Sequence, residues 1–428
     1  MKLLIPLLFL FLTGSIQAQN FDWKLLPEAP FHTCNNAVVE AFDGDHLCAY
    51  SFGGMDTSKI HSGIHQKAMK YDPITNSWSI LANLPDSSGK IASAASVVRN
   101  KIYIIGGYHV AANGHETSSN KVHVFNPLTE SFEADASPIP IPIDDHVQLV
   151  WRDSLIFVVS GWSNTQNVPN VQIFNPSLNQ WTVGTSTSNN FLYTAFGASG
   201  VIIGDTIFYH GGARMGGNFP GTDYLRKGVI NPVDPEKISW SQATASNGLI
   251  RYRAAAVTYG DRAFWMGGSE KTYNYDGVAY DGSGGVNPTT GILTYQSPSA
   301  LWKEVPGQPY GVMDLRGIAQ MSSNSWIIIG GMENGQQVSN KAYLITLDEG
   351  SLGLSDQYME RIEFFPNPVD SQLQISPLQE QSLSLFQANG KLLRKIEPGK
   401  KMIDVSDLAP GRYILQTGEG KSYSFIKK

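Results

Sequence analysis

The chain has 428 residues, of which 42% are hydrophobic and 11% aromatic, so it is long enough and apolar enough to bury a large core. Its formal net charge is only −6, and no stripe of lysine and arginine interleaves with aromatic residues, which excludes nucleic acid as an expected partner. The two cysteines, Cys34 and Cys48, are too few for a disulfide scaffold, and we expect free thiols.

The first residues have the pattern of a secretory signal peptide. Lys2 precedes an apolar run over residues 3–12, and small and polar residues follow to Ala18. This pattern predicts a signal peptide over residues 1–18. The run is too short for a comfortable membrane span, and no later segment approaches twenty apolar residues. We therefore expect an exported protein without a transmembrane segment.

An apolar run that ends in a glycine pair then recurs along the chain. The six copies are AYSFGG, IYIIGG, IFVVSG, IFYHGG, AFWMGG and WIIIGG, with spacings of 53, 54, 51, 56 and 63 residues. Five copies are followed by a run that closes on Asp-Pro or Asn-Pro. A large aromatic residue comes next, which is Trp78, Phe132, Trp181, Trp240 or Trp302. No stretch carries a helical period, so the pattern predicts an all-β repeat with four short strands in each unit.

The two ends of the repeat array complement each other. The sixth unit has no aromatic residue to open its fourth strand, whereas a spare copy, WKLLPEAP, precedes the first unit. Trp23 and Pro30 in this copy have the same spacing as Trp78 and Pro85. We therefore expect the strand at residues 21–27 to complete the last unit. A ring closed in this way hides the sheet edges that an open array would expose.

The glycine pair, the Pro turn and the tryptophan resemble the Kelch β-propeller family. The resemblance covers residues 19–348 and implies a six-bladed Kelch β-propeller, which we expect to be a monomer. Two positions depart from the pattern, because Ser160 replaces the first glycine of the third pair and Phe132 replaces the second tryptophan.

The composition shifts after a linker at residues 349–358. Short alternating apolar runs between glycine and proline turns predict a small Ig-like β-sandwich over residues 359–428. Its motifs resemble the C-terminal sorting domain of type IX secretion substrates, through Pro366, Asn367, Pro368, Gly390, Gly411, Tyr413, Lys427 and Lys428. The resemblance implies the type IX secretion machinery as a partner and a secreted or outer-surface location in a Gram-negative bacterium, either released or anchored. An ordinary Ig-like domain that binds a ligand is the alternative.

Two sets of loops lie on the same face of a propeller. One set enters the innermost strand of each blade, and the other joins the second and third strands of each blade. Counting back from the glycine pairs predicts a ligand-binding rim around the channel mouth, formed by Lys90, Tyr108, Asp144, His146, Trp162, Tyr193, Arg214, Arg251, Arg253, Asp314 and Arg316. Aromatic rings beside charged groups suit sugars or anions. Each charge could equally be solvated or form a salt bridge between blades.

No nucleophile elbow, HExxH motif or P-loop occurs, and we expect no metal and no cofactor. The sequence therefore predicts an exported binding module for a glycan or protein ligand. Whether it is an enzyme stays open, because PYGVMDLRGIAQ and YLITLD resemble the last blade of bacterial sialic acid (N-acetylneuraminate) mutarotases. That resemblance implies that Arg316, Arg253 and Glu270 act at the anomeric centre. Copper-radical oxidase chemistry is disfavoured, because both cysteines lie in the first repeat.

Overall fold

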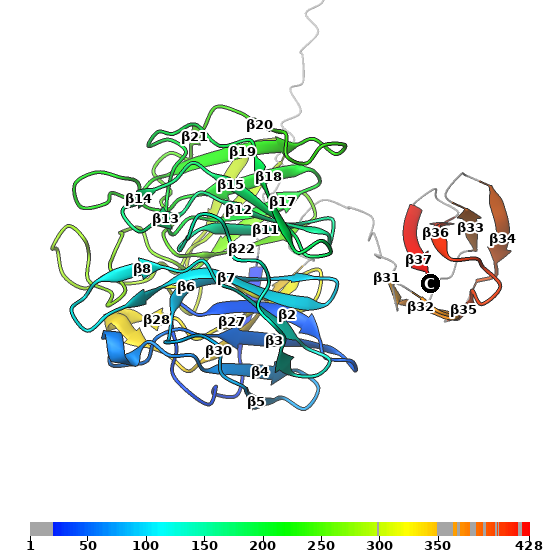
Figure 1. The fold of residues 1–428 in the computed structure, drawn as a ribbon, viewed down its shortest axis with the longest axis horizontal. Helices are drawn as coiled ribbons and strands as arrows, with labels where there is room; N and C mark the ends of the chain where they lie inside the picture. Colours follow the sequence, from blue (N-terminus) through cyan, green and yellow to red (C-terminus); the bar gives the residue numbers. More distant parts are fainter. Residues whose placement is uncertain are drawn as a thin grey trace, which may run out of the picture. The chain divides into compact units, whose positions relative to one another are not determined.

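β-Strands form almost all the regular structure of the described chain (Figure 1). The computed structural model describes residues 20–297, 299–348, 363–365, 369–376, 382–387, 391–398, 400, 402–417 and 422–428. The predicted signal peptide, the linker, Pro366, Asn367, Pro368 and Gly390 lie outside these residues. Within them, no helix has the length and apolar character needed to cross a bilayer. The chain divides into two compact units, residues 1–352 and 353–428.

The described residues of the first unit form six antiparallel sheets of four or more strands. The first sheet contains β2 (Ala37–Phe42), β3 (Leu47–Phe52), β4 (Ala68–Asp72) and β5 (Ser77–Leu81). The second contains β6 (Ile91–Val98), β7 (Lys101–Val110), β9 (Val122–Asn126) and β10 (Ser131–Phe132), with β8 (Glu116–Ser118) beside β7. The third contains β11 (Val147–Trp151), β12 (Leu155–Val159), β15 (Val171–Asn175) and β16 (Gln180–Gly184).

The fourth sheet contains β17 (Ser199–Ile203), β18 (Thr206–His210), β19 (Tyr224–Ile230) and β20 (Ile238–Trp240), with β21 (Thr244–Ala245) beside β19. The fifth contains β22 (Ala255–Tyr259), β23 (Arg262–Met266), β24 (Ile292–Gln296) and β25 (Leu301–Val305). The sixth contains β26 (Ala319–Gln320), β27 (Ser325–Ile329), β30 (Ala342–Asp348) and β1 (Asn20–Leu25). The connecting loops add hairpins β13–β14 (Trp162–Ser163, Gln166–Asn167) and β28–β29 (Met332–Glu333, Gln337–Val338), and the 3-10 turns η1 (His61–Gly63) and η2 (Asn334–Gln336).

The N-terminal strand is the outermost strand of the sixth sheet. β1 pairs with β30 along its whole length, so that Trp23 lies opposite Ile345. The indole of Trp23 donates a 2.8 Å hydrogen bond to Gln308 and packs against Tyr310 and Tyr343. Innermost strands of neighbouring sheets contact one another, β2 with β6 and β26, β6 with β11, β11 with β17, and β17 with β22. The sheets thus surround a common axis and are the blades of a β-propeller, and the all-β prediction is confirmed.

One expectation about strand ends differs in the structure. The glycine pair of the second blade was expected to end its strand, but β7 continues through Gly106 and Gly107 to Val110. The reason is the hairpin with β8, in which Tyr108 pairs with Ser118 and Val110 with Glu116.

The second unit has two sheets and a core of its own. One sheet contains β31 (Glu363–Phe365), β32 (Gln372–Ser376) and β35 (Met402–Asp404), and the other β34 (Leu392–Ile396), β33 (Leu383–Gln387), β36 (Gly411–Thr417) and β37 (Ser422–Lys427). Residues of both sheets, among them Leu373, Ile403, Leu385 and Leu415, form one apolar cluster, as in a β-sandwich. Of the predicted sorting residues, Gly411 is exposed, Tyr413 is buried with its hydroxyl donating to the carbonyl of Ala409 at 2.8 Å, and Lys427 and Lys428 end the chain.

Candidate functional site

Most of the predicted rim residues face protein. Trp162 and Arg214 are partly exposed and Glu270 is exposed, but nine others are buried: Lys90, Tyr108, Asp144, His146, Tyr193, Arg251, Arg253, Asp314 and Arg316. Residues of the loops between second and third strands and of the loops that enter the innermost strands form an apolar cluster there, which includes Tyr108, Tyr252 and Tyr273. Contact of these residues with a ligand therefore stays a prediction, and most of them make contacts between blades.

Arg253 is the centre of a buried ionic cluster. Its Nη2 lies 2.6 Å from Oδ2 of Asp145, and its Nη1 lies 2.9 Å from Oδ1 of Asp314. Arg316 joins through Nη1, 3.5 Å from Oδ1 of Asp145, and its Nη2 donates to the carbonyl of His146 at 2.6 Å. Four predicted residues, Arg253, Asp314, Arg316 and His146, are thus brought together, whereas sequence analysis missed Asp145.

The charges of this cluster compensate one another. Burial raises the pKa of Asp314, while Arg253 opposes the rise. Burial, reinforced by the Arg316 guanidinium, lowers the pKa of His146 to about 4, so its imidazole is neutral at physiological pH. Two arginines therefore face Asp145 and Asp314 in a water-poor site, where removal of one partner leaves an uncompensated buried charge.

A ring of backbone hydrogen bonds holds this cluster around the axis. Each blade has one residue with a positive φ in the loop that enters its innermost strand or, in the second blade, near the start of that strand. These residues are Asn35, Ala92, Asp145, Gly197, Arg253 and Asp314, with φ values between 47° and 65°. Amide groups donate from blade to blade, Ala92 to Asn35, Asp145 to Ala92, Gly197 to Asp145, Arg253 to Gly197, Leu315 to Arg253 and Asn35 to Asp314. The left-handed conformation turns each carbonyl toward the next blade, so the ring fixes where the charged side chains stand.

The other buried rim residues also have protein partners. Lys90 forms a 3.2 Å ion pair with Asp86, and burial lowers its pKa to about 8. Asp144 accepts a 2.6 Å hydrogen bond from Ser118, and burial raises its pKa. The remaining two pairs are Tyr193 donating to the carbonyl of Ser241 at 2.7 Å and Arg251 with Glu304 at 2.5 Å. The Lys90–Asp86 pair lies within one loop, and the other three contacts join separate segments of the chain.

Aromatic side chains remain accessible on the loop face. Trp162, Phe219 and Tyr280 are partly exposed, and each lies on a different loop. The rings of Trp162 and Phe219 are 5.6 Å apart and those of Phe219 and Tyr280 5.0 Å apart, both near edge-to-face. Phe196 packs beneath them, 5.5 Å from Trp162. We call Trp162, Phe219 and Tyr280 the aromatic cluster. Phe219 and Tyr280 were not predicted, although each lies in a loop that sequence analysis placed at the rim.

A cavity of about 480 Å³ occupies the central channel, on the other side of the ionic cluster. Six residues, one on the innermost strand of each blade, lie at the same level of the channel. Each pairs with the residue that stands four positions before the glycine pair of its blade. The six are Glu40, Val97, Val150, Ile202, Thr258 and Gln320. All six line the cavity and are partly exposed. His146 and Arg316 line it at the ionic cluster, and Asp153 at the opposite end. The channel wall thus combines aliphatic and polar groups, and Glu40 is the carboxylate among the six level residues.

That carboxylate, Glu40, was missed by sequence analysis. Its Oε2 accepts a 2.8 Å hydrogen bond from the amide of Gln320. Burial in the channel raises the pKa of Glu40 to about 7, and the hydrogen bond from Gln320 partly opposes this rise. The available signal was a charge at an inward position of the strand AVVEAF, where an apolar residue would be expected.

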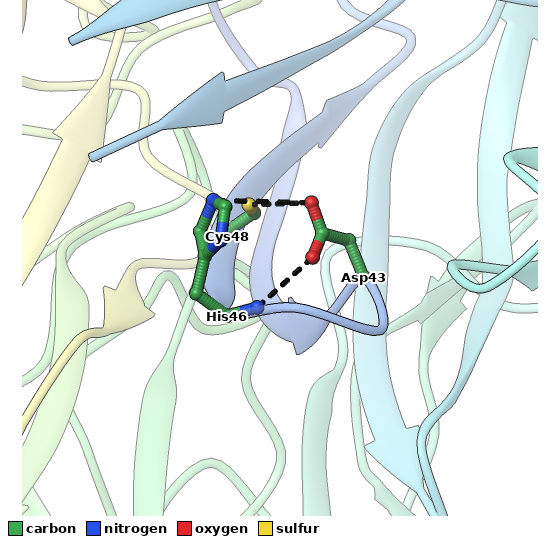
Figure 2. A group of neighbouring side chains, drawn as sticks. All are labelled: Asp43, His46 and Cys48. Carbon is green, nitrogen blue, oxygen red and sulfur yellow. Dashed lines mark hydrogen bonds and ion pairs between the residues drawn. The ribbon is translucent and has the colours of Figure 1, made fainter. Parts of the chain in front are cut away.

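Asp43, His46 and Cys48 converge at the turn between β2 and β3, and are the donor types that zinc binds (Figure 2). Oδ2 of Asp43 lies 3.4 Å from Cys48 Sγ and 3.1 Å from Lys70 Nζ, and Nε2 of His46 lies 2.7 Å from Asp72. Burial and the Asp43 carboxylate raise the pKa of Cys48 to about 12, so its thiol is protonated. Because Lys70 already forms an ion pair with the Asp43 carboxylate, we interpret this cluster as contacts that stabilise the turn between β2 and β3.

Comparisons with known proteins support this architecture. The family model described as the KLHDC2/KLHL20/DRC7 Kelch-repeats domain matches residues 32–268. The model described as the secretion system C-terminal sorting domain matches residues 363–428. The sorting domain directs the chain through the type IX system to the cell surface or the extracellular space, and the predicted location is confirmed.

The curated relatives are distant. The chain is 26% identical over 183 residues to Kelch-like protein terF of Aspergillus terreus, covering 42% of this chain and 38% of that protein. It is 26% identical over 185 residues to Kelch-like protein 25 of Xenopus tropicalis, covering 42% and 28%. It is 27% identical over 152 residues to N-acetylneuraminate epimerase of Pasteurella multocida, covering 33% and 39%. The chain thus spans less than two fifths of these relatives.

A solved structure shares the fold. The structure of YjhT superposes with a TM-score of 0.60 at 17% identity, covering 76% of this chain and 99% of that chain. At this identity the likeness concerns the fold alone.

Proposed function

Because the chain belongs to the Kelch-repeat family and carries a secretion-system sorting domain, we propose that it is an exported module that binds a glycan through the loop face of its propeller. The observation that carries the proposal is the aromatic cluster of Trp162, Phe219 and Tyr280, which three loops hold partly exposed. Sugar rings have apolar faces that stack on aromatic side chains, and loops on a rigid scaffold are where binding residues concentrate.

Charged groups beside the aromatic cluster add hydrogen-bonding capacity. Arg214 is partly exposed and stacks over the ring of Phe191, 5.3 Å from its centroid, which leaves the guanidinium edge for other partners. Glu116 is partly buried, and burial raises its pKa. Aromatic rings together with an arginine and a carboxyl group on neighbouring loops are suited to sugar hydroxyls and to acidic sugars.

Replacing Trp162 with alanine is expected to weaken glycan binding about tenfold or more, because the substitution removes the largest ring of the aromatic cluster. The measurement is a glycan array on the full chain, followed by titration of the strongest ligand. Phe42→Ala is the matched control, since Phe42 is an exposed ring at the far end of the first blade. An array without enrichment would contradict the glycan proposal and leave a protein partner. Equal loss in both variants would contradict a site at the aromatic cluster.

Similarity to an N-acetylneuraminate epimerase supports a second candidate, a sugar isomerase. Arg253 and Arg316 would then bind the substrate carboxylate and Glu270 would move protons. The two arginines are 1% and 6% exposed and both contact Asp145, so this candidate requires rearrangement of the ionic cluster.

The second candidate predicts that the chain accelerates anomerisation of free sialic acid, followed by NMR. Arg316→Ala should return the rate to background, and Arg152→Ala, at an exposed surface arginine, should not. A wild-type rate at background contradicts the isomerase.

A further inference from the structure

Glu40 lies in the wall of the central channel, at the opposite end of the blade strands from the aromatic cluster. Among the six residues that are level around the channel, it is the one with a charge; the others are Val97, Val150, Ile202, Thr258 and Gln320. All six line a cavity of about 480 Å³. A volume of this size is within the range of small-molecule sites.

Within the part of the chain that the structure describes, the Glu40 carboxylate lacks a counter-ion. It accepts the amide of Gln320, but no described lysine, arginine or histidine forms an ion pair with it. A carboxylate in such a site loses hydration, and one amide hydrogen bond does not replace the charge compensation that a cation would give. Glu40 therefore costs the fold stability, and a ligand would compensate for that loss.

Groups at the end of the channel near the ionic cluster do not supply that cation. His146 is neutral, because burial and Arg316 lower its pKa to about 4. The charge of Arg316 is directed to Asp145, 3.5 Å away. Both side chains are more than nine-tenths buried and line the cavity, and Nδ1 of His146 and Nε of Arg316 have no hydrogen-bond partner among the described residues. At the other end the lining residue is Asp153, a second carboxylate.

We propose that the channel binds a small organic cation that also carries hydroxyl groups, with its ammonium group on Glu40. The aliphatic wall at Val97, Val150 and Ile202 accommodates its carbon chain. The partly exposed side chains of Thr258 and Gln320 provide hydrogen bonds for its hydroxyls. An anion at the level of Glu40 would meet like charge there and at Asp153. This site is separate from the glycan site of the loop face and does not depend on it.

Two polyols of similar length test the charge requirement, N-methylglucamine, which is a cation, and sorbitol, which is neutral. Each is titrated calorimetrically into the full chain in an amine-free buffer about one unit above the Glu40 pKa of about 7, where an alkylammonium keeps its proton. We expect N-methylglucamine to bind and sorbitol to bind at least about tenfold more weakly. Equal affinity of the two, or no heat from either, overturns the proposal.

Three variants locate the site. Glu40→Gln keeps the shape and removes the charge, and should weaken N-methylglucamine about tenfold while leaving sorbitol unchanged. Ala256→Phe fills the lumen from another blade and should abolish binding. Glu236→Gln, at an exposed position, is the control and should bind like the unmodified chain. Unchanged binding in Glu40→Gln or in Ala256→Phe overturns the proposal. Trp162→Ala should leave this binding intact, which separates it from the loop face.

Discussion

Replacing Arg253 with methionine is expected to lower the free energy of unfolding of the propeller by about 3–5 kcal/mol. Arg253 pairs with Asp145 at 2.6 Å and with Asp314 at 2.9 Å, and all three side chains are at most 2% exposed. Methionine fills a similar volume, but Asp145 then keeps only the 3.5 Å ion pair with Arg316, and Asp314 keeps a 3.4 Å hydrogen bond from the Tyr273 hydroxyl without an ion pair among the described residues. The loss comes from those uncompensated charges, because an intact buried ion pair by itself contributes little.

The measurement is urea unfolding followed by tryptophan fluorescence. All nine tryptophans precede residue 327, so the signal reports on the first unit alone. The matched control is Arg152→Met, whose ion pair with Asp205 is 51% and 34% exposed and should contribute about 0–1 kcal/mol. Adding Asp145→Asn to Arg253→Met should recover part of the loss, since it removes one stranded charge. A loss for Arg253→Met no larger than the control contradicts this account of the cluster.

Replacing Gly106 with alanine is expected to cost about 2–4 kcal/mol, for two reasons that can be separated. Gly106 has a φ of 64°, which an alanine adopts only with strain. In addition, an added Cβ would lie 2.2 Å from the carbonyl oxygen of Ile143, which enters the third blade. That oxygen accepts the amide of Gly107 at 2.9 Å, so it cannot move without breaking an inter-blade contact.

Gly204→Ala is the control that isolates the second reason. Gly204 has a φ of 62°, but nothing lies within 4 Å of its added Cβ. It should lose only the conformational part, about 1–2 kcal/mol. The same fluorescence unfolding experiment compares the two variants. Equal losses would show that backbone conformation alone requires the glycine pair, and that blade packing does not.

Much of the fold was predictable because its signals are local. Apolar runs of strand length, the glycine pair and the Asp/Asn-Pro turn each act within a few residues, and they recur in phase. Trp23 could be assigned to the far end of the array because it repeats the spacing of the other blades, and β1 pairs with β30 in the structure. The signal-peptide pattern is likewise local, because it lies within the first eighteen residues.

The candidate site was predictable only in part. Counting from the glycine pairs places Arg253, Asp314 and Arg316 at the entries to innermost strands, and in the structure these residues come together through Asp145 and Asp314, while ligand binding by them stays a prediction. It gave no information on exposure, because burial depends on how the long loops fold over those entries. Glu40 was overlooked because its role depends on the five residues at the same level of the channel, which come from the other blades and are known only from the structure.

The sequence by itself determined the all-β repeat, the closure by the N-terminal strand and the export of the chain, since these follow from local patterns and their period. Only the tertiary structure decided which charged groups pair and which remain for a ligand. Arg253 and Asp145 are 108 residues apart, and they meet because a ring of backbone hydrogen bonds brings alternate blades to one axis. Among the described residues Glu40 forms no ion pair, because the same geometry surrounds it with level side chains that carry no charge. Pairing of this kind depends on distances across the ring, which no spacing along the chain encodes.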